Sequence, residues 1–199
     1  MITARDYKIS LAVGLAIGIL LTPILFILHI VFPYRAIITI ALCMLAMPAG
    51  LWFGSVLQRY LGFGVRFSKY AAGGLLSFSI DFAVLNIMSY MTGVAAGLTV
   101  GWINMPGFFL ATINAYFFNK LWVFGKNNDQ GVFAHLPKFL FVVFIGIMIN
   151  SSVVVVVSTH ITPLFGMSPQ RWLNIAKIVA SGVAIMWNFY GYKHIAFKE

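Results

Sequence analysis

Two ionisable residues lie inside long apolar stretches, where charged side chains are rare. Asp81 stands about twelve residues into the segment 69–91, or ~18 Å along a helix, and Lys177 stands about six residues into 171–197, or ~9 Å. Such groups in a membrane segment must be neutralised, paired or hydrated, and they are functional-site hypotheses by default. We expect both to face one interior cavity; an ion pair that only fixes helix packing is the alternative.

Membrane-spanning helices must position these residues. Of the 199 residues, 61% are hydrophobic and 9% charged, whereas a soluble domain is roughly half apolar and a quarter charged. Six apolar segments are each long enough to cross ~30 Å of hydrocarbon as a helix. They span 9–32, 36–58, 69–91, 98–124, 137–161 and 171–197. The fold class predicted is therefore an all-α integral membrane protein with six transmembrane helices.

Basic residues gather at alternate ends of these segments. The formal net charge is +9, and Lys and Arg fall mostly on one side of a six-span topology. That side holds Arg5, Lys8, Arg59, Arg66, Lys69, Lys120, Lys126, Lys138, Lys193 and Lys198, against Arg35 and Arg171 on the other. The asymmetry predicts cytoplasmic N- and C-termini, and contact with anionic membrane lipids rather than nucleic acid.

A weak repeat relates the third and fourth segments to the fifth and sixth. The matched pairs are Lys69 with Lys138, Asp81 with Asn150, Asn104 with Lys177, and Lys120 with Lys193. Each repeat is one helical hairpin in the same orientation, as in parallel-repeat transporters. We therefore expect a four-helix membrane domain at 61–199, preceded by a two-helix extension at 1–60. The repeat also places Asn104 and Asn150 beside Asp81 and Lys177.

Other chemistry has little support in the sequence. The histidines show no metal-ligand spacing, and no catalytic constellation or phosphate-binding glycine loop is present. The sequence therefore predicts no enzyme activity, no metal and no cofactor.

The stretch from Arg66 to Phe197 resembles the GtrA-like family of small four-helix membrane proteins. The resemblance is carried by Lys69-Tyr70 with Gly73-Gly74 and Asp81, by Asn119-Lys120-x-Trp122-Val123-Phe124, by Lys138-Phe139 with Gly146 and Asn150, and by Ala176-Lys177 with Asn188-Phe189 and Phe197. Two features depart from the family pattern. The first ~60 residues have no counterpart in it, and the last helix ends in Tyr192-Lys193-His194, without the Asn and Trp of the earlier motif.

The resemblance implies translocation of a polyprenyl-phosphate-linked monosaccharide, such as an undecaprenyl phosphate sugar, across the bacterial inner membrane for cell-surface glycan modification. It also implies partner glycosyltransferases that make this lipid on the cytoplasmic face. The substrate-binding residues expected from the resemblance and the repeat are Asp81, Lys177, Asn104, Asn150, Lys69, Lys120, Asn119, Lys138, Asn188 and Lys193.

Two other functions remain open at this stage. One is a non-transporting membrane scaffold for a polyprenyl-phosphate glycosyltransferase, which leaves Asp81 and Lys177 without a role. The other is a small-molecule or drug transporter, which predicts cationic substrates and is disfavoured by Lys177. A homodimer would thicken the wall that four or six helices can build around a headgroup.

Overall fold

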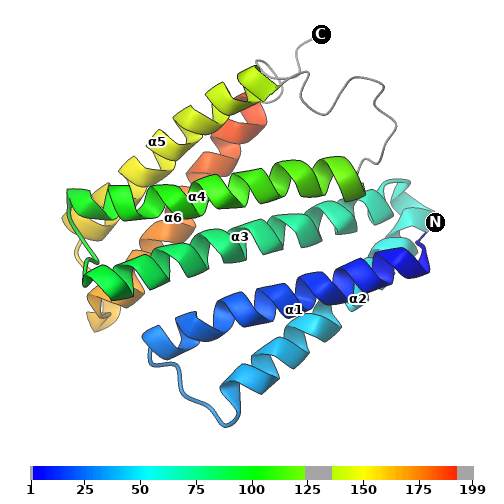
Figure 1. Cartoon of the computed structure of the whole chain (residues 1–199), viewed down its shortest axis with the longest axis horizontal. Coiled ribbons are helices and arrows are strands. Elements are labelled where there is room, and N and C mark those ends of the chain that lie inside the picture. The colour runs from blue at the N-terminus through cyan, green and yellow to red at the C-terminus, as the bar shows by residue number, and fades with distance from the viewer. Residues whose placement is uncertain (1, 124–135, 192–199) are drawn as a thin grey trace. The chain divides into compact units, whose positions relative to one another are not determined.

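The computed structural model describes residues 2–123 and 136–191, and every regular element in these ranges is helical (Figure 1). Six long helices confirm the predicted fold class. They are α1 (Ala4–Ile27), α2 (Arg35–Leu61), α3 (Gly64–Thr92), α4 (Leu98–Phe118), α5 (Leu136–His160) and α6 (Pro169–Gly191). A π-helical turn, Asn119–Val123, follows α4, and a 3-10 turn, Leu164–Gly166, precedes α6.

Within the described residues, four helices are long and apolar enough to cross a membrane: α1, α2, α3 and α5. The other two are shorter than α3 and carry polar residues within the helix, Asn104 and Asn114 in α4, and Asn174 and Lys177 in α6. These side chains lower the hydropathy on which such assignments depend. The chain is thus an all-α membrane protein, and membrane crossing by α4 and α6 stays a prediction.

The helices divide into two compact units, and the division passes through the middle of α3 and α4. Unit 1 comprises residues up to Ala83 together with the chain from Leu110 to the end of the π-helical turn. Unit 2 comprises Val84–Phe109 together with α5 and α6. The domain boundary expected near residue 60 separates a two-helix extension from a four-helix membrane domain. It is a different division from the two compact units, and it stays a prediction.

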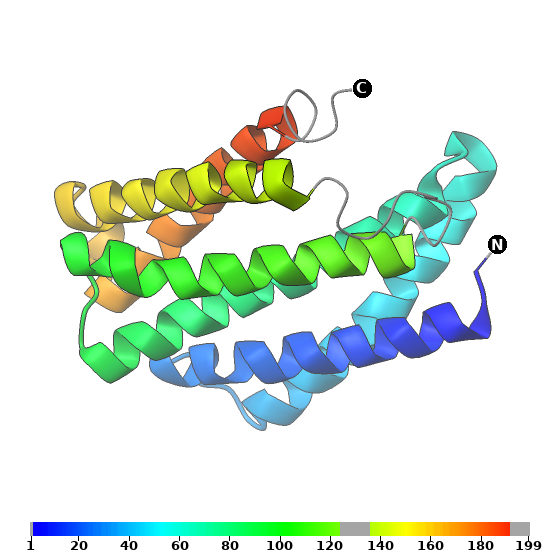
Figure 2. The same cartoon turned by 45° about the horizontal axis from the view of Figure 1, so that its top comes forward.

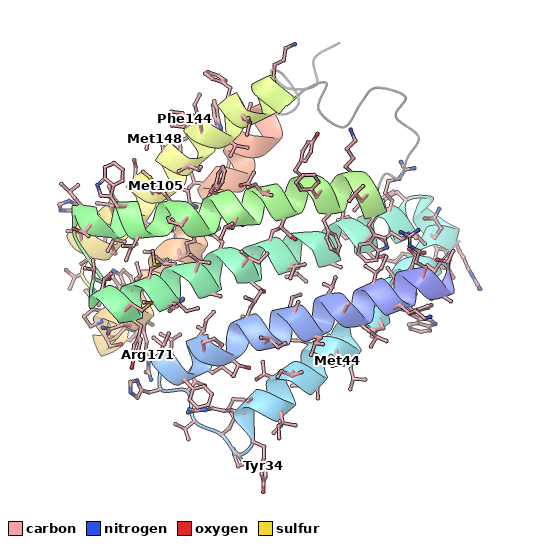
Figure 3. All side chains as sticks on the ribbon, viewed as in Figure 1. Tyr34, Met44, Met105, Phe144, Met148 and Arg171 are labelled. Carbon is pink, nitrogen blue, oxygen red and sulfur yellow. The ribbon has the colours of Figure 1, made fainter. Side chains whose placement is uncertain are left out.

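In unit 1, α1 and α2 form an antiparallel hairpin with backbones in close contact (Figure 1). A Cβ added to Gly18 would lie only 2.6 Å from the Cα of Ile40, and one added to Gly14 would meet the backbone of Cys43. Small residues four apart allow this approach in membrane helices. The hairpin turn ends at Tyr34, which adopts a left-handed conformation and points away from the helices (Figure 3).

Helix α1 begins at Ala4, earlier than the apolar segment expected from residue 9. Thr3 and Asp6 form a capping box, in which each side chain accepts a hydrogen bond from the backbone N–H of the other. This motif satisfies amide groups that have no intrahelical partner, so the polar residues before the apolar run can be helical.

In the rest of unit 1, the first half of α3 contacts the end of α2 and the second half of α4. Gly64 lies against the backbone of Gly54, so α3 starts close to the end of α2. Further along α3, the hydroxyl of Ser77 accepts a hydrogen bond from Asn114 of α4 at 2.9 Å. These contacts bring the start of α3 and the end of α4 to the same end of unit 1.

Unit 2 is built around α5 and α6, which pack against each other in antiparallel directions (Figure 2). Its core includes Leu85, Val100, Val154 and Leu173, contributed by four different helices. The indole N–H of Trp172 donates to the backbone carbonyl oxygens of Val157 and Ile161, and so ties the start of α6 to the end of α5. On the outer side of α5, Phe144 and Met148 point away from the helices (Figure 3).

Candidate functional site

Lys177, in the middle of α6, has the largest fully buried side chain among the described residues. Its ammonium nitrogen lies 2.6 Å from Oδ1 of Asn104 and 3.1 Å from Oδ1 of Asn150. Taking an ammonium out of water costs several kcal/mol unless polar groups replace its hydration. Two amide oxygens supply part of that replacement here.

The two asparagines are also bonded to each other and to a serine. Nδ2 of Asn104 donates to Oδ1 of Asn150 at 2.9 Å and to the hydroxyl of Ser151 at 3.0 Å. The ring of Phe108, one turn after Asn104, has its centroid 5.9 Å from the ammonium nitrogen. We name Lys177, Asn104, Asn150 and Ser151 the Lys177 cluster. Its members come from α4, α5 and α6.

One hydrogen-bond donor of the Lys177 cluster is buried without an acceptor in the described part of the chain. Among the described residues, the amide nitrogen Nδ2 of Asn150 is buried and has no hydrogen-bond acceptor. Turning the amide over would not help, because Oδ1 already accepts from Lys177 and Asn104, and these are both donors. An unmatched buried donor costs about 1–3 kcal/mol and calls for an explanation.

A cationic cluster with a spare N–H donor is suited to bind an oxygen-rich anion. An ammonium makes a stronger hydrogen bond to phosphate than to a neutral amide oxygen, so a phosphate group could displace the asparagines from Lys177. The released amides could then bind hydroxyl groups. In the structure the cluster is closed, since each of its four side chains is at most 3% exposed. Binding therefore requires the helices of unit 2 to separate locally.

Unit 2 also contains a buried polar pair that was not predicted from the sequence. Asn86 of α3 and Asn174 of α6 donate to each other's Oδ1 at 2.8 and 2.9 Å, and both are buried. The spacing offered a signal, because Asn174 precedes Lys177 by three residues and so shares its helix face. The pair is neutral and reciprocal, which is typical of a packing contact.

Unit 1 contains a different polar group, which we name the Asp6 cluster: Asp6, Lys69, Trp122 and Thr3. The ammonium nitrogen of Lys69 lies 2.6 Å from Oδ1 of Asp6, and the indole N–H of Trp122 donates to the same oxygen at 2.8 Å. Thr3 donates to Oδ2 through its amide and its hydroxyl. Lys69 was expected to attract phosphate, but in the structure it is paired with a carboxylate.

Asp6 and Trp122 were not among the predicted site residues. Asp6 precedes the first apolar segment, and 63 residues separate it from Lys69, so neither periodicity nor the repeat connects them. The π-helical turn that carries Trp122 was also unexpected. Such turns are rare and occur frequently at functional sites.

Asp81 is buried in unit 1, whereas Lys177 belongs to unit 2. The structure describes each unit by itself, so the expected pairing of these two residues stays a prediction. The cavity that both were expected to face also stays a prediction.

The remaining expected residues are less informative. Lys120 and Asn119 are half-buried in the π-helical turn, and Lys138 is exposed near the start of α5. The side chain of Asn188 and the whole of Lys193 lie outside the described residues.

The fold and the Lys177 cluster together define a small polytopic membrane protein with a polar, cationic site inside its helices. Residues 69–197 match the family model for the GtrA/DPMS transmembrane domain, and the chain belongs to this family. Its members have membrane functions related to polyprenyl-phosphate-linked sugars. The match begins at Lys69 and leaves the whole of α1 and α2 and the first five residues of α3 outside it. No curated protein and no solved structure matches the chain.

Proposed function

We propose that the protein moves a polyprenyl-phosphate-linked monosaccharide across the bacterial inner membrane for use in cell-surface glycans. The observation that carries this proposal is the Lys177 cluster. It combines a fully buried ammonium with amide groups, and Nδ2 of Asn150 has no acceptor among the described residues. Family membership supplies the substrate class.

The substrate presents one phosphodiester and one sugar to the protein. A lone phosphate in hydrocarbon is prohibitively unfavourable, so a cation within the path is what translocation needs. In this proposal the phosphate oxygens replace Asn104 and Asn150 at the Lys177 ammonium. The asparagine amides then bond the sugar hydroxyls, while the polyprenyl chain stays in the lipid.

Other residues assist at the two stages of the path. Lys120, Lys138 and Lys193 collect the anionic headgroup on the cytoplasmic side, where each basic residue contributes about 1 kcal/mol near an anionic surface. Asn119 and Asn188 lie near this side in the family motif, and Asp81 contributes hydrogen bonds deeper in the membrane. Both termini are cytoplasmic in this proposal, beside a partner glycosyltransferase. The protein catalyses no covalent step, and transport runs down the substrate gradient.

The test is headgroup flipping of a short-chain polyprenyl-phosphate sugar in proteoliposomes. We expect Lys177→Met to lower the flipping rate at least about tenfold, since it removes the charge-assisted bond to phosphate and keeps the side-chain length. Asp81→Asn tests the second ionisable group in the same assay.

The matched control is the double variant Asn86→Ala/Asn174→Ala. It removes the neutral amide pair of unit 2 and leaves the Lys177 cluster intact, so it should destabilise the fold yet keep flipping. Equal loss of flipping in the control and in Lys177→Met would contradict a specific role for the ammonium.

The scaffold hypothesis makes the opposite prediction for the native protein. It is favoured by the hairpin before the family segment, because α2 exposes large apolar side chains such as Trp52 and Phe53 over most of its length. A scaffold would bind a polyprenyl-phosphate glycosyltransferase and show no flipping in vesicles. That combination of results would replace transport as the proposed function.

A further inference from the structure

Two hydrogen-bond donors converge on a single oxygen in unit 1. The ammonium of Lys69 and the indole N–H of Trp122 lie 2.6 and 2.8 Å from Oδ1 of Asp6. Neither group can accept a hydrogen bond, and one carries a positive charge. The point where they meet is therefore suited to an anionic oxygen, and a carboxylate occupies it in this structure.

The donors and the acceptor come from different parts of the chain. Lys69 and Trp122 lie within the segment that matches the family, whereas Asp6 precedes it. The family segment thus supplies a site for an anion, and the added hairpin supplies the anion that fills it.

A pocket of about 200 Å³ lies along the start of α3, and its lining includes the residues that directly follow Lys69 and Trp122 in the chain. Arg66 lines it one turn before Lys69, and Val123 lines it directly after Trp122. The other lining residues are Phe63, Phe67 and Tyr70, which are exposed. The lining surface is apolar, so the pocket offers aromatic and apolar contacts for a hydrocarbon chain.

We propose that Lys69 and Trp122 bind the phosphate of a prenyl lipid headgroup, and that the Asp6 carboxylate holds this site until the lipid phosphate displaces it. The prenyl chain lies against the aromatic residues of the pocket. This inference rests on the proposed function, because it names the place where the substrate first binds.

The contacts of Asp6 allow such an exchange. Thr3 holds the other carboxylate oxygen, Oδ2, at 2.9 and 3.0 Å, so the carboxylate stays anchored to the first turn of α1 when Oδ1 is released. The Lys69 side chain is 15% exposed, which lets its ammonium turn toward the pocket without unfolding the helix. Phosphate competes well because it offers more oxygens to the same donors.

The experiment measures binding of a short-chain polyprenyl phosphate to the full chain in nanodiscs. Asp6→Asn removes the competing charge and keeps an acceptor for the amide of Thr3, so we expect binding to tighten about tenfold, the equivalent of one charge-assisted bond. Lys69→Gln should abolish specific binding. Thr22→Ala is the matched control in the same helix, because its hydroxyl donates to the backbone carbonyl oxygen of Gly18, several turns away from Asp6; lipid binding should stay unchanged.

Each other outcome overturns the inference. If Asp6→Asn binds the polyprenyl phosphate no more tightly than the native protein, or fails to fold, the carboxylate only stabilises the fold. Inorganic phosphate serves as a second probe, and equal binding of it would show a free-phosphate site instead of a lipid site. Flipping is measured separately on the same variants. Tighter lipid binding without any flipping contradicts the proposed function alone, whereas native flipping with unchanged binding in Asp6→Asn contradicts this inference alone.

Discussion

Each of the two units contains a hydrogen-bonded lysine, but the acceptors around the two lysines differ. Lys69 in unit 1 bonds a carboxylate at 2.6 Å, and Lys177 in unit 2 bonds amide oxygens at 2.6 and 3.1 Å. A carboxylate balances the charge of the ammonium it bonds, whereas an amide oxygen solvates the ammonium without adding charge. The contrast suggests that a substrate phosphate must compete with an anion at Lys69 and with neutral groups at Lys177.

The depth of the two lysines strengthens this contrast. Lys69 lies five residues after the start of α3 and is partly exposed, while Lys177 lies in the middle of α6 and is fully buried. Burial makes each electrostatic contact stronger, because the effective dielectric constant falls. This contrast agrees with the two proposals, in which the substrate first binds at Lys69 and passes through the membrane at Lys177.

The largest expected effect tests whether Lys177 also pairs with Asp81. Pairing, as the sequence predicts it, means that Asp81→Lys and Lys177→Asp each bring two like charges together, which should cost about 3–5 kcal/mol of unfolding free energy, as for breaking a buried ion pair. The double variant restores opposite charges and should recover much of that loss. Unfolding in mixed micelles measures the stability. A double variant no better than either single one would show that the two residues do not pair.

A smaller effect is expected when Lys177 is given a carboxylate acceptor like that of Lys69. Asn150→Asp replaces an amide oxygen by a carboxylate at 3.1 Å from the ammonium and removes the Nδ2 donor that has no acceptor in the described chain. We expect the folded state to be kept and the flipping rate to fall about tenfold, since phosphate must now displace an anion. Asn150→Ala is the control for loss of the amide alone. Unchanged flipping in Asn150→Asp would mean that the charge of this site does not matter.

The sequence predicted much of unit 2 and less of unit 1. The six helices follow from apolar runs of about 20 residues. In lipid, such a segment must satisfy its own backbone hydrogen bonds, and a single segment does so as a helix. The repeat register placed Asn104, Asn150 and Lys177 together because corresponding positions of two hairpins lie at similar depth. Hydrogen bonds join the three in the structure, while their role in binding a substrate stays a prediction.

The Asp6 cluster could not be predicted for physical reasons. Its carboxylate lies outside the apolar segments and outside the repeat, and its partner follows 63 residues later. Periodicity describes the faces of single helices, and it carries no information on which helix ends meet. The capping box that starts α1 at Ala4 is a local pattern of polar residues, which a search for apolar runs passes over.

The smallest expected effect compares a tryptophan in each unit. Trp122 donates to the charged carboxylate of Asp6 at 2.8 Å, and Trp187 donates to the backbone carbonyl oxygen of Val142 at 2.9 Å. Bonds to charged groups are worth about 1.5–3 kcal/mol and neutral ones about 0.5–1.5 kcal/mol. Trp122→Phe should therefore lower the unfolding free energy by about 1 kcal/mol more than Trp187→Phe does.

Unfolding of both variants in the same mixed micelles measures this difference, and repeating it in the Asp6→Asn background supplies the control. Without the charge at position 6, the two substitutions should cost about the same. A difference that survives Asp6→Asn would instead come from packing around Trp122, whose ring is in contact with Phe118. Only a difference that depends on Asp6 shows that unit 1 is stabilised by a charge at the helix ends, in contrast to the neutral acceptors that hold unit 2 together.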